Sequence, residues 1–291
     1  MKKDGLFWLL LLLWAVVPCA RGDVAPATLV SFNGANGANP LASLVQGTDG
    51  NFYGTTDLGG SAGYGTVFRM TTNGTLTTLV AFNSSNGAYP QAALTLGNDG
   101  NFYGTTEQGG GVLFGTVFKM TAAGALTTLV AFNYGNGSHP YAALTPGNDG
   151  NFYGTTQQGG SAGYGTVFKV TTNGALTTLA AFNLNNGANP YAALTLGKDG
   201  NFYGTTDQGG SAGYGTVFKM TTNGTLTTLV AFNSSNGAYP EAALTLGNDG
   251  NFYGTTQQGG SAGYGTVFRM TTNGTLTTLV AFNSKIGRAH V

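Results

Sequence analysis

The sequence has little of what enzyme active sites and metal sites are usually built from. Its 291 residues include one Cys and two His, and only 8% are charged, against the usual quarter. His139 is the single histidine ahead of Ser284, so a catalytic triad or a zinc site has almost no material. The sequence predicts no catalytic residue, no metal ligand and no cofactor.

Clusters of Lys and Arg are also missing. Between Asn33 and Asn283 the chain has six Lys and Arg against nine Asp and Glu, a net charge of −3. Proteins that bind nucleic acid need clustered basic side chains to neutralise phosphates, so a nucleic-acid partner is excluded. Glycine is abundant, at 50 residues, and hydrophobic residues make up 41%, which is enough to build a core and argues against disorder.

The first 22 residues differ in chemistry from everything after them. Lys2 and Lys3 precede an apolar run from Leu6 to Val17, and residues 20–22 offer small side chains where a signal peptidase cuts. The run is too short for a permanent membrane helix, which needs about 20 apolar residues. We interpret residues 1–22 as a signal peptide and expect a secreted or cell-surface, extracytoplasmic protein without a transmembrane span.

The one cysteine, Cys19, lies inside this segment. The mature chain is therefore expected to have neither a disulfide nor a free thiol, which suits an oxidising compartment. An alternative is a lipoprotein signal that acylates Cys19. Pro18, directly before it, departs from the small residue that such signals require, which favours plain secretion.

Residues 285–291 interrupt the pattern of the rest of the chain. After Asn283 the sequence should continue as S-S-N-G-A-Y-P, but from Lys285 it reads K-I-G-R-A-H-V, which resembles a translated sequencing adapter. We interpret this tail as non-native and expect the natural protein to be longer.

An internal repeat of 50 residues dominates the sequence between these ends. The motif D-G-N-F-Y-G-T-T starts at Asp49, Asp99, Asp149, Asp199 and Asp249, and the motif G-T-V-F starts at Gly65, Gly115, Gly165, Gly215 and Gly265. The repeat region spans 23–284, and its units lie near 33–82, 83–132, 133–182, 183–232 and 233–282.

Each unit contains four short β-prone runs separated by turn residues. In the unit that follows Pro90 the runs are Ala92–Leu96, Phe102–Thr106, Gly115–Thr121 and Leu126–Phe132. Thr, Val, Phe, Tyr and Leu dominate them, none is long enough for a helix, and Asp-Gly or Asn-Gly pairs supply tight turns. Each unit is predicted to be a four-stranded antiparallel meander made of two hairpins.

Apolar residues fall on both sides of these strands. In the third strand Phe68 and Met70 share one side and Val67 takes the other. One side of the fourth strand is expected to carry Leu76, Thr78, Val80 and Phe82. A sheet covered on both faces must pack between copies of itself, as propeller blades do, and small residues such as Gly104 fit a crowded central axis. A β-solenoid is the alternative, but its coils are shorter, about 20–30 residues, and lack two hairpins per unit.

We therefore predict an all-β fold, a β-propeller of four-stranded antiparallel blades. Thr28–Phe32 has the pattern of a fourth strand that precedes any first strand, so we expect it to complete another blade. The fifth unit has its own fourth strand, Leu276–Phe282, which makes five blades a lower bound.

The units resemble the Gloeobacter/Verrucomicrobia tandem repeat, called the GloVer repeat. The resemblance covers Ala27–Asn283 and depends on D-G-N-F-Y-G-T-T, G-T-V-F-K-M-T and L-T-T-L-V-A-F-N. It implies an exported protein, and several members are expected to end in a sorting or anchoring signal that this sequence does not show. The family carries no established biochemical activity, so the resemblance leaves the function open.

The two long loops of each unit are predicted to share one face, because alternate connections of a meander emerge at the same edge. These loops are 83–90 and 107–114 with their equivalents, and they carry most of the differences between units. Binding residues tend to lie on loops held by a rigid scaffold. The candidate ligand-binding residues are the aromatic set Tyr64, Phe114, Tyr164, Tyr214 and Tyr264, together with Asp57, Glu107, Asp207, Tyr89, His139 and Tyr239.

Each candidate has a structural alternative. The aromatic rings could stack on sugars or capture a peptide, or could cover the adjacent blade and its Gly-rich loop, which is the favoured interpretation. The repeated Asp of N-D-G-N could ligate calcium, but Asp before Gly is the ordinary hairpin pair and one carboxylate per turn is too few. No spacing enforces a catalytic pair among the loop carboxylates Asp57, Glu107, Asp207 and Glu241.

The sequence thus predicts an exported repeat scaffold with a non-enzymatic binding or structural role at the cell surface or outside the cell. A carbohydrate or a protein on the long-loop face is the expected partner. The alternative is a propeller hydrolase or lyase acting on a polysaccharide, with Asp57, Glu107 and Asp207 near the mouth of the ring. The scarcity of catalytic residues favours the first interpretation.

Overall fold

The computed structural model describes residues 27–283, whose regular structure is β-strand. Twenty strands form five antiparallel sheets of four strands each, so the predicted propeller of four-stranded blades is confirmed. In this part of the chain no helix has the length and apolarity that crossing a bilayer requires. The predicted signal peptide, 1–22, and the tail, 285–291, lie outside the described residues.

Every blade repeats the same four strands, of two, five, five and six residues. The first blade consists of β1 (Val45–Gln46), β2 (Phe52–Thr56), β3 (Thr66–Met70) and β4 (Leu76–Ala81). The second consists of β5 (Thr95–Leu96), β6 (Phe102–Thr106), β7 (Thr116–Met120) and β8 (Leu126–Ala131). The third consists of β9 (Thr145–Pro146), β10 (Phe152–Thr156), β11 (Thr166–Val170) and β12 (Leu176–Ala181). The fourth consists of β13 (Thr195–Leu196), β14 (Phe202–Thr206), β15 (Thr216–Met220) and β16 (Leu226–Ala231). The fifth consists of β17 (Thr245–Leu246), β18 (Phe252–Thr256), β19 (Thr266–Met270) and β20 (Leu276–Ala281).

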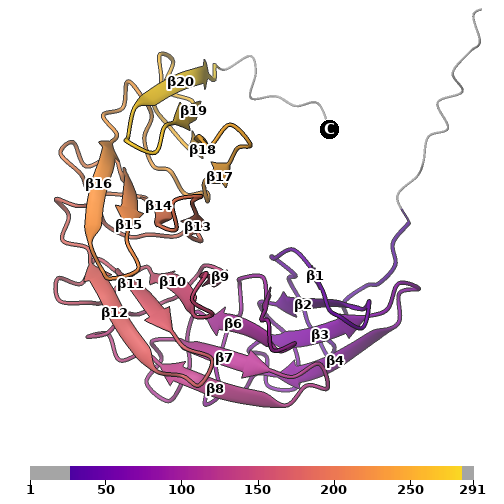
Figure 1. Ribbon diagram of the computed structural model, residues 1–291. Coiled ribbons are helices and arrows are strands. Elements are labelled where there is room, and N and C mark those ends of the chain that lie inside the picture. Colours follow the sequence, from indigo (N-terminus) through magenta and orange to yellow (C-terminus); the bar gives the residue numbers. More distant parts are fainter. Residues whose placement is uncertain (1–26, 284–291) are drawn as a thin grey trace, which may run out of the picture.

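The blades are arranged around a common centre. Within each sheet the strands follow one another in sequence order, and Figure 1 shows the two-residue strands toward the centre and the six-residue strands on the rim. The units radiate instead of stacking along a straight axis, which excludes the β-solenoid. The arc is open, with a gap between the fifth blade and the first (Figure 1).

The first strand of each blade is shorter than predicted. The second blade illustrates this, because Ala92–Leu96 is predicted and only Thr95–Leu96 is a strand. The residues before the strand turn to the preceding blade, where the carbonyl of Ala92 accepts a hydrogen bond from Thr55 Oγ1 at 2.9 Å. Thr95 Oγ1 donates in the same way to the carbonyl of Leu144 in the following blade, at 2.7 Å. Threonine hydroxyls therefore join neighbouring blades close to the centre.

The prediction that residues 28–32 form a strand is wrong. An outer strand pairs with the third strand of its own blade, and no third strand precedes this segment among the described residues. The segment still lies where an outer strand lies: a Cβ placed on Gly74 would meet the carbonyl oxygen of Leu29, just as one on Gly124 would meet that of Leu79.

The outer strand of every blade carries a β-bulge. In β4, Val80 pairs with Val67 and Thr78 pairs with Phe68, so Leu79 has no partner in β3. The predicted alternation, with Leu76, Thr78, Val80 and Phe82 on one side, is therefore wrong. An extra residue moves the following side chains to the opposite side of the sheet, and Leu79 itself packs against the cluster between the first two blades.

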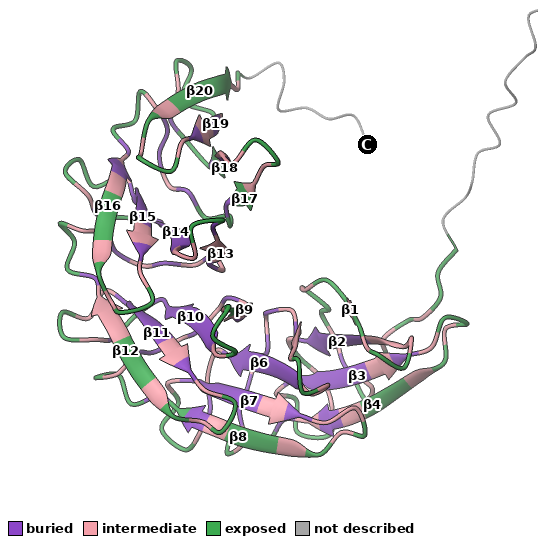
Figure 2. Cartoon of the chain, viewed as in Figure 1, coloured by how far each residue is buried: buried purple, intermediate pink, exposed green. Residues whose placement is uncertain are grey.

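The hydrophobic core lies between blades. One cluster joins Tyr53, Val67, Val80 and Phe82 of the first blade to Leu94, Phe102, Phe118 and Met120 of the second. The rings of Tyr53 and Phe102 stack across this joint with centroids 4.1 Å apart. Figure 2 shows that burial is concentrated in the middle strands and that the rim strands are largely exposed. The prediction that a sheet is covered on both sides is confirmed for the three inner blades, whereas the first and the fifth blade each have one side that no described blade covers.

Gly104 is required by packing within its own blade. A Cβ at this position would lie 2.5 Å from Cζ of Phe118, which pairs with Gly104 across β6 and β7. The expectation that Gly104 serves a crowded central axis is corrected, since the ring of Phe118 occupies the space beside it.

Candidate functional site

The two long loops of each unit do share one face, as predicted. The loop that leads into the second blade is hydrogen-bonded to the β6–β7 loop of that blade, with Ala88 N donating to Gln108 O at 2.8 Å. It is also bound to the preceding blade, because Tyr89 N donates to Tyr64 O at 2.9 Å. Each long loop is thus fixed by two blades.

Backbone strain is concentrated on this long-loop face. Every described non-glycine residue with positive φ lies in a long loop: Asn39, Ser84, Tyr89, Leu113, Tyr134, His139, Leu184, Asn189, Ser234 and Tyr239. Bulky residues such as Tyr and Leu rarely adopt this conformation. Strain of this kind persists only where the surrounding structure imposes it, and it gathers at functional sites.

The predicted aromatic residues lie along the seams between blades. Tyr64 and Tyr89 are a close pair with ring centroids 5.8 Å apart, and Tyr214 and Tyr239 form the equivalent pair at 5.9 Å. Four of the set pack partly against the clusters between blades: Tyr64, Phe114, Tyr164 and Tyr214. Tyr264, which no blade follows, is 59% exposed. This packing corresponds to the alternative in which each ring covers the adjacent blade.

A different group of side chains converges where the long loops lead into the inner strands. Glu107 lies at its centre, accepting hydrogen bonds from Gln91 Nε2 and from the hydroxyl of Tyr141, both at 2.8 Å. The ring of Tyr141 lies 5.6 Å from that of Tyr191 in the next blade and 6.4 Å from that of His139, between centroids. Three consecutive blades therefore contribute to one patch.

The patch continues into the fifth unit. Gln157 Nε2 donates a hydrogen bond to the hydroxyl of Tyr191. Burial raises the pKa of Tyr191, and the nearby carboxylates Asp207 and Glu241 raise it further. We call this group the mouth cluster; its members are Asp57, Gln91, Glu107, Tyr141, Gln157, Tyr191, Asp207 and Glu241.

Two carboxyl groups of the mouth cluster hold their protons more tightly than usual. Burial raises the pKa of Asp57, and the neighbouring charge of Glu107 raises it further. Burial likewise raises the pKa of Asp207, with a further contribution from Glu241. Asp57 Oδ1 is buried without a hydrogen-bond partner. The structure thus places Asp57 near Glu107 and Asp207 near Glu241, which their spacing in the sequence did not predict.

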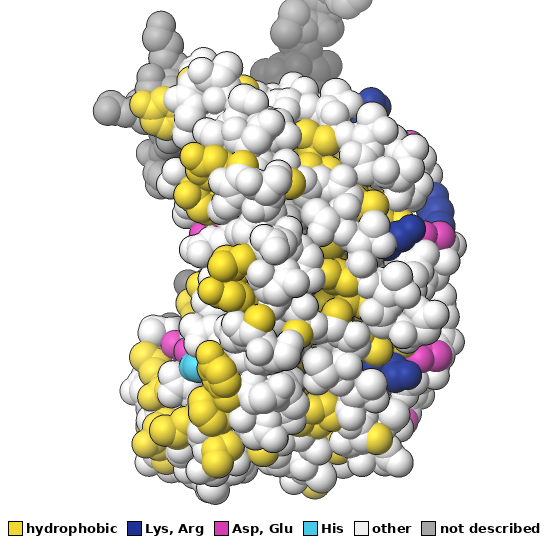
Figure 3. All heavy atoms as spheres, turned by 90° about the vertical axis from the view of Figure 1, so that its left-hand side faces the viewer, with side chains coloured by type: hydrophobic (Ala, Val, Ile, Leu, Met, Phe, Trp, Pro, Cys, Tyr) yellow, Lys and Arg dark blue, Asp and Glu magenta, His cyan; other side chains and the backbone are white. Residues whose placement is uncertain are grey.

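Basic side chains are confined to one of the two faces. The described Lys and Arg residues lie in or beside the tight turns, at positions 69, 119, 169, 198, 219 and 269, and the long loops contain none. Figure 3 shows basic and acidic side chains together along one edge of the molecule, and a histidine with acidic side chains alone at the opposite edge. The mouth cluster therefore lies in a negative field that no cation of the described chain offsets locally.

The repeated Asp of the tight turns has a structural task. Asp99 accepts hydrogen bonds from Asn101 N, at 3.1 Å, and from Asn101 Nδ2 and the Tyr103 hydroxyl, both at 2.8 Å. Burial opposes ionisation of Asp99, but the hydrogen bonds from Lys119, Asn101 and Tyr103 outweigh it and hold the pKa of Asp99 well below its usual range. Within residues 27–283 no three His, Cys, Asp or Glu side chains are arranged to hold a metal ion.

Sequence reasoning found part of the mouth cluster. It identified Asp57, Glu107 and Asp207 as site candidates, and the structure places them with His139 in the patch or beside it. It also considered Glu241 among the loop carboxylates, but it missed Gln91, Tyr141 and Tyr191, which occupy the same position after the loop proline in their own units. Variation at that one position was the available signal, because flanking residues are nearly invariant between units.

Comparison with known proteins identifies the repeat and the fold. A family model described as Gloeobacter/Verrucomicrobia repeat matches residues 20–146 and 114–290. No curated protein matches the sequence. Virginiamycin B lyase from Staphylococcus aureus is similar in structure, with a TM-score of 0.57 and 18% identity over 84% of this chain and 70% of that one. A gluconolactonase from Xanthomonas campestris gives 0.51 and 12% over 84% and 76%. These likenesses establish the propeller fold alone.

Proposed function

The chain belongs to the Gloeobacter/Verrucomicrobia repeat family, and from that premise and its propeller fold we propose that it is an exported, non-enzymatic scaffold that binds carbohydrate at the mouth cluster. The observation that carries the proposal is that variable residues from several units lie together in the mouth cluster. The positions that vary between units include the residue after the loop proline and the residue after the second strand. Four residues from each of these two positions meet in one patch.

The composition of the patch suits a sugar. Tyr141 and Tyr191 offer amphipathic rings that cover the apolar face of a pyranose at low entropy cost. Glu107, Gln91 and Gln157 supply acceptors and donors for hydroxyl groups beside those rings. Because the loops are fixed by two blades each, little ordering is required on binding.

Export is the part of the proposal that rests on sequence. Two lysines followed by the apolar run 6–17 and small residues at 20–22 have the order of a secretory signal. A polysaccharide outside the cytoplasm is a ligand that such a protein would meet.

The binding proposal is tested by removing the tyrosine rings. We expect Tyr141→Ala and Tyr191→Ala each to weaken binding to a responsive polysaccharide by about tenfold or more, measured by glycan array and calorimetry. Leu41→Ala is the matched control, because Leu41 occupies the same position in the first unit and is 63% exposed. Equal binding by all three variants would contradict the proposal.

A second candidate function is cleavage of a polysaccharide at the same patch. Burial and a neighbouring carboxylate raise the pKa of Asp57 and of Asp207, and two carboxyl groups in unlike environments favour acid–base catalysis. The names of the two structural neighbours, a lyase and a gluconolactonase, are consistent with propellers that carry such chemistry.

Single carboxylate changes separate the two functions. If the protein cleaves its ligand, Glu107→Gln or Asp207→Asn should abolish product formation while binding persists, as followed by reducing-end or unsaturated-sugar assays. If it only binds, no product accumulates with any polysaccharide that the wild-type protein retains, and the tyrosine variants alone lose affinity.

A further inference from the structure

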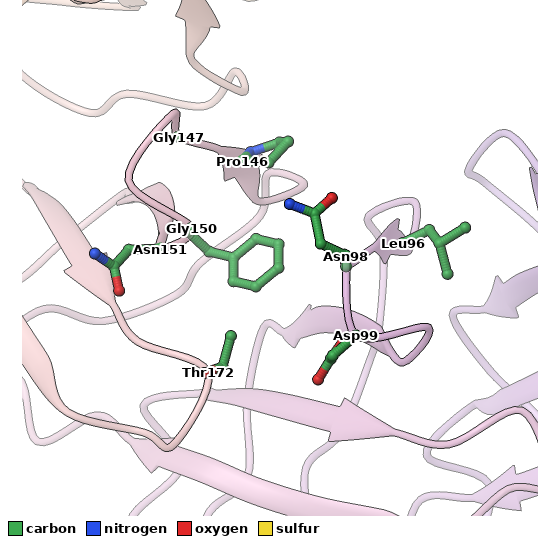
Figure 4. Close-up of a pocket in the computed structure, with 10 residues that line it drawn as sticks. Leu96, Asn98, Asp99, Pro146, Gly147, Gly150, Asn151 and Thr172 are labelled. Carbon is green, nitrogen blue, oxygen red and sulfur yellow. The ribbon is translucent and has the colours of Figure 1, made fainter.

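The face opposite the mouth cluster carries a hollow of about 200 Å³ between the second and third blades. We infer that this hollow is a binding site for a single neutral sugar ring. It lies between the tight turns that follow β5 and β9, and its lining includes Leu96, Asn98, Pro146, Phe152 and Thr172 (Figure 4). Drug-sized pockets begin at about 300 Å³, so the hollow accommodates one ring and not an oligosaccharide.

The hollow lies where one residue departs from the repeat. Pro146 ends β9 at the position that Leu96, Leu196 and Leu246 occupy in other blades. Those leucines pack partly against clusters between blades, whereas Pro146 is exposed and joins no such cluster. The smaller, rigid ring of proline leaves unfilled the space that a leucine side chain covers.

The polar groups of the lining are few and available. Figure 4 shows the amide of Asn98 reaching across the opening toward Pro146 and the side chain of Thr172 directed at the same space from the next blade. Neither side chain takes part in a hydrogen bond within the described residues. Leu96, Pro146 and Phe152 supply carbon surface between them. An apolar floor with an amide and a hydroxyl at the rim matches a pyranose, which has apolar ring faces and hydroxyl groups around its edge.

The site is electrically neutral, which restricts the ligand class. Asp99 contributes to the lining, but Figure 4 shows its carboxylate turned away from Asn98 and Pro146. That carboxylate already accepts hydrogen bonds from Asn101 and Tyr103 and forms an ion pair with Lys119 at 2.8 Å. With the charge compensated, no group in the hollow attracts a cation or an anion.

The other joints of the same face provide internal controls. Between the third and fourth blades the polar pair is the same, Asn148 and Thr222, but Leu196 stands where Pro146 stands. Between the fourth and fifth blades Lys198 extends across the joint and donates to the carbonyl of Asn248 at 2.9 Å. The proline alone therefore distinguishes the second joint from the third in these three positions.

The experiment is a titration of the full chain with glucose, galactose, mannose and N-acetylglucosamine, followed by amide chemical shifts of Gly97 and Gly147. We expect at least one sugar to bind with a Kd of about 1–10 mM, the range for one ring with few contacts. Pro146→Leu introduces the residue that three other units have at this position, so it should fold normally and weaken binding at least about tenfold. Leu196→Pro should create a second, equivalent site between the third and fourth blades.

Two results would overturn the inference: no saturable shift with any of the four sugars up to about 50 mM, whether or not cyclohexanol binds, or unchanged binding by Pro146→Leu. If Leu196→Pro disturbs folding, Pro146→Leu alone tests whether the hollow binds the sugar. Because the hollow lies on the face opposite the mouth cluster, Tyr141→Ala should leave these shifts unaltered.

Discussion

Joints inside the arc and the two open ends are built from the same residues but give them different surroundings. Leu194, in the fourth blade, is 4% exposed, whereas its equivalent Leu44 in the first blade is 44% exposed. At the other end Val280 is 40% exposed and its equivalent Val230 only 8%. The outer strands Leu226–Ala231 and Leu276–Ala281 have the same sequence, so a neighbouring blade, and not the blade itself, supplies the burial.

The different exposure of equivalent residues shows that a single blade has no hydrophobic core of its own. Each sheet has apolar side chains on both faces and buries them only by contact with the blades before and after it. Stability is then a sum over joints between neighbours, as in other repeat proteins. Equivalent substitutions should therefore have costs that depend on position along the arc.

The largest contrast is expected for the phenylalanine that ends the outer strand. Phe132 is fully buried, with its ring 5.2 Å from that of Phe168, and Phe132→Ala should lower the free energy of unfolding by about 3–5 kcal/mol. Phe32 makes the same contact with Phe68, at 5.1 Å, but belongs to a segment that no sheet holds. Phe32→Ala should cost less than half as much in urea unfolding; equal losses would mean that the open end is as firmly built as the interior.

The inner leucine gives the next contrast. Leu194→Ala removes a side chain packed between two blades and should cost about 2–5 kcal/mol, whereas Leu44→Ala should cost less than about 1 kcal/mol because Leu44 is already partly hydrated. Thermal unfolding of the two variants side by side measures the difference. A similar fall in melting temperature for both would show that Leu44 is covered in solution.

The threonine hydrogen bonds near the centre should show the same dependence on position in the arc, with a smaller change in the free energy of unfolding. Thr145 Oγ1 donates to the carbonyl of Leu194 in the next blade at 2.7 Å, so Thr145→Val should cost about 0.5–1.5 kcal/mol. Thr245 has no such bond within the described residues, which contain no blade after the fifth. Thr245→Val should be nearly neutral in the same unfolding assay, and a clear loss there would contradict the assignment.

Substitutions of the tight-turn aspartates should have the same cost inside the arc and at its ends, because these aspartates form hydrogen bonds within one unit. Hydrogen bonds from Asn251 and Tyr253 lower the pKa of Asp249, and those from Asn151 and Tyr153 lower that of Asp149 against the opposing effect of burial. A carboxyl with a lowered folded-state pKa stabilises the protein above its unfolded pKa of about 3.9, and that contribution is lost as pH falls through the folded value.

Stability should therefore decline below about pH 4, and Asp149→Asn and Asp249→Asn should reduce this acid sensitivity by similar small amounts. Urea midpoints measured between about pH 2.5 and 6 test the expectation. A much larger change for Asp149 than for Asp249 would show that the turns, too, depend on the neighbouring blade.

The sequence was sufficient to predict the blade because its signals are local. Turn pairs such as Asp99-Gly100 and runs such as Phe102–Thr106 fix hairpins over a few residues, and Phe102–Thr106 is the strand observed. What it did not predict depends on partners far along the chain. The short inner strand reflects the bond between Thr55 and Ala92 in neighbouring blades, and the bulge at Leu79 reflects a register shift against β3.

The candidate site divides in the same way. Asp57, Glu107 and Asp207 were identified because they vary between units on a predicted loop. Tyr141 and Tyr191 were missed because the residue after the loop proline directly precedes a predicted strand, and only the curvature of the arc brings four such residues together. Pro146 shows the same limit, since a single Leu-to-Pro difference gains meaning only beside the turn of the preceding blade.

The β-bulge in each outer strand affects the tendency of the protein to aggregate at high concentration. The rim has five exposed strand edges of nearly the same sequence, and each edge could pair with the edge of another molecule. Identical edges are the most compatible templates for growing sheets. The unpaired Leu79 and its counterparts interrupt the row of free amides and carbonyls on each edge and twist it away from flatness. Because every repeat carries its own β-bulge, additional blades add exposed strand edges that are poorly suited to edge-to-edge pairing.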